Sequence, residues 1–157
     1  MKVYILRHGE AEGHSPEGDF GRNLTLHGRT QAEQVLQRFR FMEFVPEAVF
    51  YSTANRATQT VQPILDEFAD AKNFATKSLY LAGVDAMRKV VSEHRKELSS
   101  LKNFLFVGHN PGWSEAISRL SGEFVGLGVS QGALLEIDHE DICDALQLDR
   151  SWSYISG

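Results

Sequence analysis

Two arginines and two histidines of this chain have the residue types needed to bind and attack a phosphoryl group. Arg7 and His8 come directly after the apolar run Val3–Leu6, a shorter apolar run precedes Arg56, and a third precedes His109. Arginines offer forked, permanently charged donors that match phosphate oxygens. Nearby positive charge disfavours the imidazolium form of a histidine, so a neutral His8 can attack phosphorus and carry the phosphoryl group covalently.

The elements that must position these side chains alternate between strand and helix patterns. Apolar runs predict strands over residues 2–7, 48–52, 74–80, 103–107, 133–137 and 152–155, with helices between most of them. This alternation predicts an α/β fold, a three-layer sandwich with a mostly parallel central sheet. Ligands of such sheets bind outside the carboxyl ends of the strands. The two arginines and two histidines are therefore expected to meet at one edge of the sheet.

Three helix patterns carry specific expectations. Thr25 is a plausible N-cap for a first helix, and Pro63 is expected to kink or shorten the second. A later helix is expected to begin at Asn110-Pro111, with the asparagine as N-cap and the proline at the first helical position. Its backbone N–H groups and positive dipole end would then point at the phosphate.

Length, charge and cysteine content limit the kind of protein this is. The 157 residues fit one domain spanning 1–157, expected to be a monomer. The net charge of −5 argues against nucleic-acid or anionic-membrane partners, and no apolar run is long enough to cross a bilayer. Cys143 is the only cysteine, so we expect no internal disulfide and a cytoplasmic location. The histidines are scattered, so we expect no structural metal.

Four motifs in order and spacing resemble the histidine phosphatase superfamily, which contains phosphoglycerate mutase and acid phosphatases. The short length and an Arg-x-Leu-Thr element look most like its SixA-type branch of phosphohistidine phosphatases. The resemblance implies a phosphoglycerate mutase-like fold. The motifs are Leu6–Glu10, Arg22–Thr25 followed by Gly28, Ser52 with Arg56-Ala57 and Gln59-Thr60, and Val107–Pro111.

The resemblance also implies roles for single residues. His8 matches the phosphorylated nucleophile, and Arg22 matches an arginine that helps to bind phosphate or substrate. The implied reaction needs no metal and no cofactor. The positions that match the phosphate pocket are Arg7, Arg56 and His109, and those that match its rim are Ser52 and Asn110.

The chain departs from the superfamily at the proton donor. Many members use a glutamate between the second arginine and the second histidine, but residues 78–85 contain no glutamate. Asp85 is the only carboxylate there, so Asp85, water or His109 remain open as the donor. Glu10 is either a pocket residue or a solvated charge, and Asp19 is expected to be an ordinary loop residue.

These patterns favour a phosphatase that forms a covalent phosphohistidine at His8 and acts on phosphohistidine of a signalling or phosphotransfer protein. An imidazole leaving group, with a reference pKa of ~6.5, needs less help from an acid than an alkoxide does. One alternative is a phosphomonoesterase of the same superfamily that acts on small phosphate esters. A non-catalytic phosphate-binding module is the other alternative, although His8 and the arginines are intact.

Overall fold

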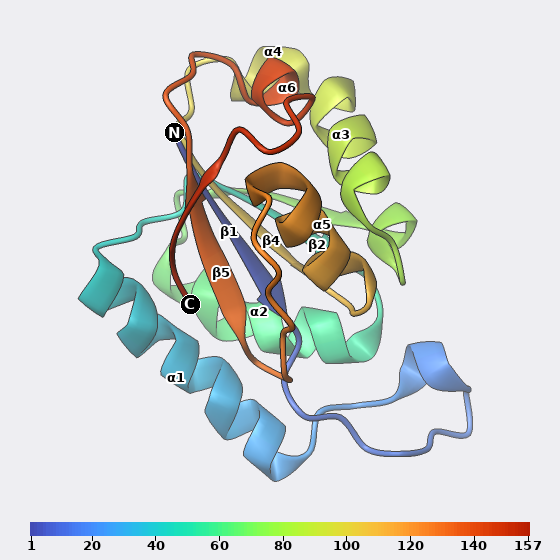
Figure 1. Cartoon of the computed structure of the whole chain (residues 1–157). Helices are drawn as coiled ribbons and strands as arrows, with labels where there is room; N and C mark the ends of the chain where they lie inside the picture. Colours follow the sequence, from blue (N-terminus) through green and yellow to red (C-terminus); the bar gives the residue numbers. More distant parts are fainter.

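The computed structural model describes residues 1–157 and is built around one six-stranded sheet (Figure 1). Apolar residues dominate the four inner strands, which are buried on both faces of the sheet. The strands are β1 (Lys2–Arg7), β2 (Ala48–Ser52), β3 (Lys72–Thr76), β4 (Asn103–Gly108), β5 (Gly132–Glu136) and β6 (Ser153–Ser156).

The strand order is β3-β2-β4-β1-β5-β6, which places β1 and β4 side by side in the middle of the sheet. The first four of these strands are parallel, whereas β5 and β6 run antiparallel to their neighbours. Arg7 pairs with Gly108 in the register of β1 and β4. His8 and His109, one residue further along each strand, therefore leave the sheet next to one another.

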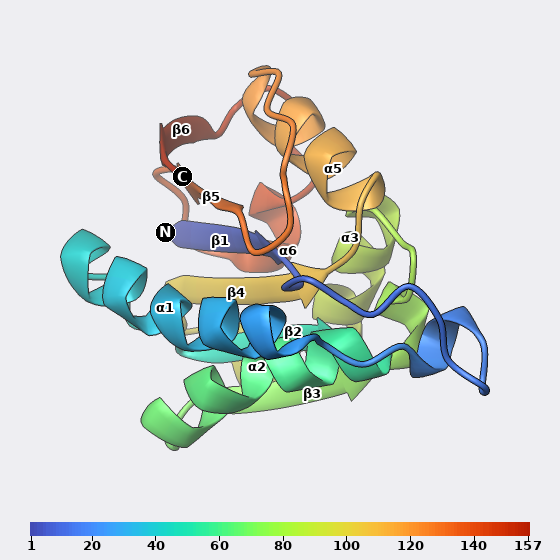
Figure 2. The ribbon, with the colours of Figure 1, turned by 90° about the horizontal axis from the view of Figure 1, so that it is seen from below.

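Helices cover both faces of the sheet and form the outer layers (Figure 2). One face is covered by α1 and α2, and the other by α3, α5 and α6. The three-layer α/β sandwich with a mostly parallel sheet is thereby confirmed. The helices are α1 (Leu26–Met42), α2 (Asn55–Glu67), α3 (Val84–Glu93), α4 (Arg95–Leu98), α5 (Gly112–Ser121) and α6 (Ile142–Ala145), with single 3₁₀ turns η1 (Asp19–Gly21) and η2 (Lys77–Leu79).

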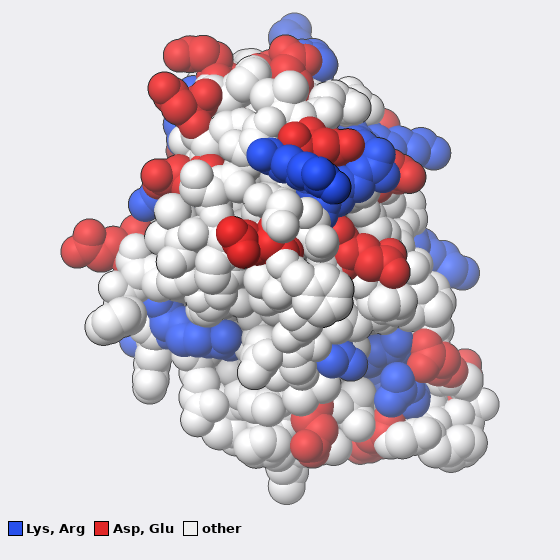
Figure 3. Space-filling view, viewed as in Figure 1, with Lys and Arg blue, Asp and Glu red and all other residues white.

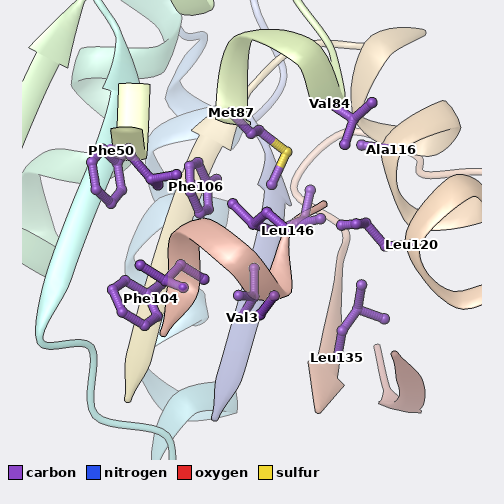
Figure 4. Packing of buried hydrophobic residues seen from close by; sticks show 14 of the residues in the cluster. Val3, Phe50, Val84, Met87, Phe104, Phe106, Ala116, Leu120, Leu135 and Leu146 are labelled. Atoms are coloured by element: carbon purple, nitrogen blue, oxygen red, sulfur yellow. The ribbon is translucent and has the colours of Figure 1, made fainter. Parts of the chain in front are cut away.

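Two apolar clusters hold the layers together. The larger one, of 24 buried residues, lies between the sheet and α3, α5 and α6, and Figure 4 shows Phe50, Phe104 and Phe106 packing within it. A second cluster of 11 residues lies beneath α1 and α2. Each large apolar side chain contributes about 1.5–3 kcal/mol on full burial, so both faces fix the strand ends firmly.

The third strand and third helix differ from the prediction. The sequence predicted a strand over 74–80, but β3 ends at Thr76 and the chain turns into η2. The turn forms because the Thr76 hydroxyl accepts a hydrogen bond from the Ser78 N–H at 3.2 Å. The helical pattern over 84–98 divides into α3 and α4 at His94. Pro63 does not end α2, which continues to Glu67.

The helix after β4 begins one residue later than predicted. The Asn110–Pro111 peptide is cis, and α5 starts at Gly112. Asn110 still caps the helix, because its side-chain oxygen accepts a hydrogen bond from the Ser114 N–H at 3.1 Å. The Trp113 N–H donates to the His109 carbonyl. The N–H groups of Trp113 and Ser114, in the first turn of α5, therefore donate to the residues that precede the helix. The sequence had predicted that the N–H groups of this turn point at the phosphate.

Helix length and the surface charge of one face can both be described. The helices are all too short or too polar to traverse a bilayer. Figure 3 shows acidic and basic side chains lying beside one another across one face of the molecule.

Candidate active site

A cavity of about 410 Å³ opens at the carboxyl ends of β1 and β4. All five predicted site residues line it, so the topology brings together side chains from segments far apart in the sequence. The residues that line it are Arg7, His8, Glu10, Ala11, Asp19, Arg22, Arg56, Leu81, His109, Asn110 and Val129.

His8 is held as a neutral ring with one nitrogen free to react. Its side chain is 6 % exposed, and Nδ1 lies 2.7 Å from the Gly9 carbonyl oxygen. Because a carbonyl only accepts, Nδ1 carries the proton and Nε2 keeps its lone pair. Arg56 Nε donates to that lone pair at 3.2 Å. The lone pair of His8 Nε2 therefore already faces the Arg56 guanidinium.

The surroundings lower the pKa of His8 to about 4. Burial is the largest cause, and Arg56, Arg7 and Arg22 lower it further, while the hydrogen bond to Gly9 acts in the opposite direction. The prediction of a neutral His8 at neutral pH is confirmed. Its largest single cause is desolvation, however, whereas the sequence argument named the neighbouring cations.

His109 lies beside His8, with ring centroids 5.3 Å apart. Its Nε2 is 2.8 Å from the Ser52 hydroxyl oxygen, which also accepts the Ala54 N–H. The Nδ1 atom is buried and has no partner in the protein. Burial, followed by the charge of Arg56, lowers the pKa of His109 to about 3. The ring is therefore a neutral, polar group that Ser52 orients.

Two arginines reach the cavity from different elements. Arg7, the last residue of β1, donates from Nη1 to the Leu127 carbonyl at 2.9 Å, and its buried Nε has no partner. Arg56, in the first turn of α2, is only 2 % exposed. A guanidinium has five N–H donors, and Arg56 uses one each from Nε, Nη1 and Nη2. It retains two for an oxyanion.

Asp19 joins the third arginine to this set. Its carboxylate lies 3.0 Å from Arg22 Nε and 3.0 Å from Arg56 Nη2, and it accepts the Tyr80 hydroxyl. The Tyr80 hydrogen bond is the largest cause that lowers the pKa of Asp19 to about 2, and the two arginines add to it. The prediction that Asp19 is an ordinary loop residue is wrong. Arg22 lies in the pocket, as predicted.

Comparison with known proteins shows what the chain is similar to. Residues 3–77 match the model of the histidine phosphatase superfamily (branch 1). Over this part the chain resembles the histidine phosphatase superfamily. A candidate phosphohistidine phosphatase SixA of Agrobacterium tumefaciens is 26% identical, with a TM-score of 0.76 over 90% of this chain and 94% of that one. The fold of the chain is therefore similar to that of a SixA-type structure.

Two further relatives are similar to the chain. A protein histidine phosphatase SixA in complex with tungstate is 20% identical, with a TM-score of 0.78 over 99% of this chain and 95% of that one. An uncharacterised chloroplast protein of Arabidopsis thaliana is 28% identical over 86% of this chain. The chain spans 66% of the length of that curated relative.

Asp85, the carboxylate that the sequence offered near the third strand, does not lie in the cavity. The Asp85 side chain is 87 % exposed, pairs with Arg88 at 3.7 Å, and does not line the cavity. Glu10 does line it, and its Oε1 accepts the Thr25 hydroxyl at 2.8 Å. The carboxylates of the pocket are therefore Glu10 and Asp19.

Sequence reasoning missed two residues that shape the site. Tyr80 packs edge-on against His109, with ring centroids 5.3 Å apart, and against Phe20, at 4.9 Å. The sequence did not indicate a role for Tyr80, because residues 74–80 were predicted to form a strand. Asp19 left one signal, its i,i+3 spacing to Arg22, but that spacing is common in loops. Thr60 lies beneath the site, where its hydroxyl accepts the Gly9 N–H at 3.0 Å.

Proposed function

We propose that the chain is a phosphatase that works through a covalent phosphohistidine at His8, and that its substrate is phosphohistidine on a protein. The observation that carries the proposal is the fixed lone pair of His8 Nε2, which Gly9 orients and Arg56 contacts inside a cavity with three arginines. A nucleophile needs that lone pair, and a phosphoryl group needs those donors.

The proposed reaction has two steps. His8 Nε2 attacks phosphorus while the substrate P–N bond breaks, and the electron pair of that bond stays on the departing imidazole nitrogen. Arg7, Arg22, Arg56 and His109 would bind the phosphoryl oxygens as their charge redistributes. A water molecule then attacks the phosphorus on His8, the P–Nε2 bond breaks, and the phosphate takes up the oxygen and both protons of the water, one of which it later loses to solvent. His8 regains its lone pair.

The pocket carboxylate Asp19 supports a nitrogen leaving group. Asp19 stays ionised at neutral pH because its pKa is lowered to about 2, so it has no proton to give an ester oxygen. General acid catalysis commonly contributes about 10²–10⁴-fold, and an alkoxide leaves poorly without it. An imidazole that already carries a proton on its distal nitrogen leaves as a neutral ring. This difference favours phosphohistidine.

Accessibility supports a substrate carried on a protein. Asp19 and Arg22 lie at the pocket and keep part of their side chains exposed to solvent. A histidine side chain on a protein surface can therefore reach the phosphate-binding donors. The SixA structure that binds tungstate, itself an oxyanion, is consistent with such a site.

The deciding experiment compares two substrates with two histidine variants. Wild type, His8→Ala and His27→Ala would be incubated with a histidine-phosphorylated phosphotransfer domain and, separately, with an aryl phosphate. His27 is the matched control because it is exposed and lies outside the cavity. We expect wild type and His27→Ala to dephosphorylate the domain much faster than the ester, and His8→Ala to be inactive.

Two other outcomes would change the proposal. Efficient turnover of the ester with the phosphorylated domain untouched would establish a small-molecule phosphomonoesterase. Phosphate binding without any turnover that depends on His8 would establish a non-catalytic module. Trapping the labelled phosphoryl group on His8 by rapid quenching would test the covalent step directly.

A further inference from the structure

The cavity proposed to bind a phosphoryl group also contains the negatively charged side chain of Asp19. The Asp19 carboxylate lines the same cavity as His8, although it would repel a bound phosphate. Arg56 bridges the two residues, since its Nε donates to His8 Nε2 at 3.2 Å and its Nη2 donates to Asp19 Oδ2 at 3.0 Å. The carboxylate is therefore one guanidinium group away from the attacking nitrogen.

The carboxylate keeps room for one more hydrogen-bond donor. Its Oδ2 accepts from Arg56 and Tyr80, and its Oδ1 accepts from Arg22 alone. An ionised carboxylate has about four acceptor positions, so one remains on Oδ1. The side chain is also 47 % exposed, so an incoming group can reach it.

We propose that Asp19 determines substrate specificity by accepting the distal N–H of the departing imidazole ring, which favours phosphohistidine over phosphate esters. This inference rests on the function proposed above and assigns its preference to one residue. The preference has a chemical origin. Phosphohistidine carries the phosphoryl group on one ring nitrogen, and a proton on the other nitrogen makes the ring cationic.

That proton decides the quality of the leaving group. When His8 attacks, the P–N bond breaks and its electron pair stays on the ring nitrogen. A ring protonated on its distal nitrogen then leaves as neutral imidazole, whereas an unprotonated ring would leave as an anion. A carboxylate that accepts the distal N–H stabilises the protonated ring. A phosphate ester has no such N–H, so it gains nothing from Asp19.

Positioning of the arginines is the competing role for Asp19. Loss of its contacts to Arg22 and Arg56 would weaken phosphate binding, and that effect would be the same for every phosphorylated substrate. The ratio of kcat/KM for two substrates separates the two roles, because a shared loss cancels. The probes are phosphoimidazole and para-nitrophenyl phosphate, which are small enough to need no docking surface.

The test uses Asp19→Asn, with Asp85→Asn as the matched control. Both changes remove one carboxylate charge, but Asp85 lies outside the cavity. We expect Asp19→Asn to lower the ratio of phosphoimidazole to aryl phosphate turnover by roughly tenfold or more, the usual effect of losing a charged hydrogen-bond partner. Asp85→Asn should leave both rates unchanged. Thermal unfolding would verify that both variants fold.

Each remaining outcome has a definite meaning. An equal loss with both substrates in Asp19→Asn, mainly through KM, would refute the specificity role and leave Asp19 as a positioning residue. An unchanged ratio with unchanged rates would refute both roles. Wild type that hydrolyses only the aryl ester would refute the proposed function itself, and this inference with it.

Discussion

His8 Nε2 and Arg56 Nε form a hydrogen bond at 3.2 Å that joins the proposed nucleophile to a proposed phosphate-binding cation. The bond is possible only while the ring is neutral, because a protonated Nε2 has no lone pair to accept it. The burial that lowers the pKa of His8 to about 4 thus also preserves the geometry of the resting site. Burial of the His8 ring therefore keeps Nε2 unprotonated and maintains its hydrogen bond to Arg56.

The first prediction concerns the titration of this ring. Between pH 8 and pH 5 the His8 ring signals in an NMR spectrum should stay constant, since its pKa is about 4, and they should move only below pH 5. A free histidine, with a reference pKa of ~6.5, would change within that range. Assignment through the His8→Ala spectrum identifies the signals. A midpoint near 6.5 for His8 would contradict the burial argument.

The second prediction concerns Arg56. Arg56→Lys should lower kcat/KM by about 10²–10³-fold, because one ammonium cannot reproduce three directed hydrogen bonds to His8 and Asp19. Steady-state kinetics with the preferred substrate measure the loss. Arg119→Lys, a change of the same kind at an exposed ion pair, is the control and should have no effect. Comparable activity in both variants would remove Arg56 from the site.

At this scale the sequence identified the basic residues and missed their acidic partner. Arg7, His8 and His109 were recognisable because each directly follows an apolar strand. Asp19 and Tyr80 were not, because their contact depends on the path of a loop rich in glycine and on the turn after β3. Neither path has a periodic pattern. Contacts between two irregular segments are the part of a site that sequence periodicity does not encode.

Among the elements, α5 approaches the β3–α3 connection closely enough to exclude a side chain. A Cβ added to Gly112, the first residue of α5, would lie 1.8 Å from the Ala82 carbonyl oxygen. The same helix start follows directly after His109 and Asn110. The absence of a side chain at Gly112 therefore allows α5 to pack against Ala82, and we expect this packing to fix the position of His109.

The third prediction follows from this contact. Gly112→Ala should destabilise the protein by about 1–3 kcal/mol, the usual cost of overpacking, and should also lower activity because His109 shifts. Urea unfolding and kinetics measure the two effects. Gly13→Ala is the matched control, since an added Cβ there meets nothing within 4 Å. Equal stability of both variants would show that α5 can move away freely.

Element types were predicted better than element ends. The strand over 48–52 is confirmed to the residue, because an apolar run between polar segments has clear limits. The end of β3 and the start of α5 were wrong, because a threonine side chain turns the chain in one place and a cis peptide precedes the helix in the other. Both ends depend on local hydrogen bonds and backbone geometry that hydrophobic periodicity does not report.

For the whole molecule, two buried neutral histidines make stability depend on pH. His8 and His109 have pKa values of about 4 and about 3 in the folded protein, against ~6.5 in an unfolded chain. Between pH 6.5 and 4 the unfolded chain therefore binds more protons than the folded one. Stability should fall as the pH falls through this range and should be fully present above pH 6.5.

The fourth prediction puts a slope on this effect. Each of the two histidines should contribute up to about 1.4 kcal/mol per pH unit below pH 6.5. Urea unfolding of wild type and His109→Asn at several pH values between 7 and 4.5 measures it. The variant should lose part of the slope, because asparagine does not titrate. Parallel curves for the two proteins would show that His109 protonates equally in both states.

The pairing of β1 with β4 also bears on the order of events during synthesis. Lys2 pairs with Asn103, so the strand that leads into His8 is made roughly a hundred residues before the strand it lies against. At ~5–20 residues per second a ribosome needs several seconds to cover that distance. Throughout that interval His8 has neither its neighbouring strand nor His109 beside it. A nascent chain released before β4 emerges would therefore carry His8, the proposed nucleophile, without the rest of its pocket.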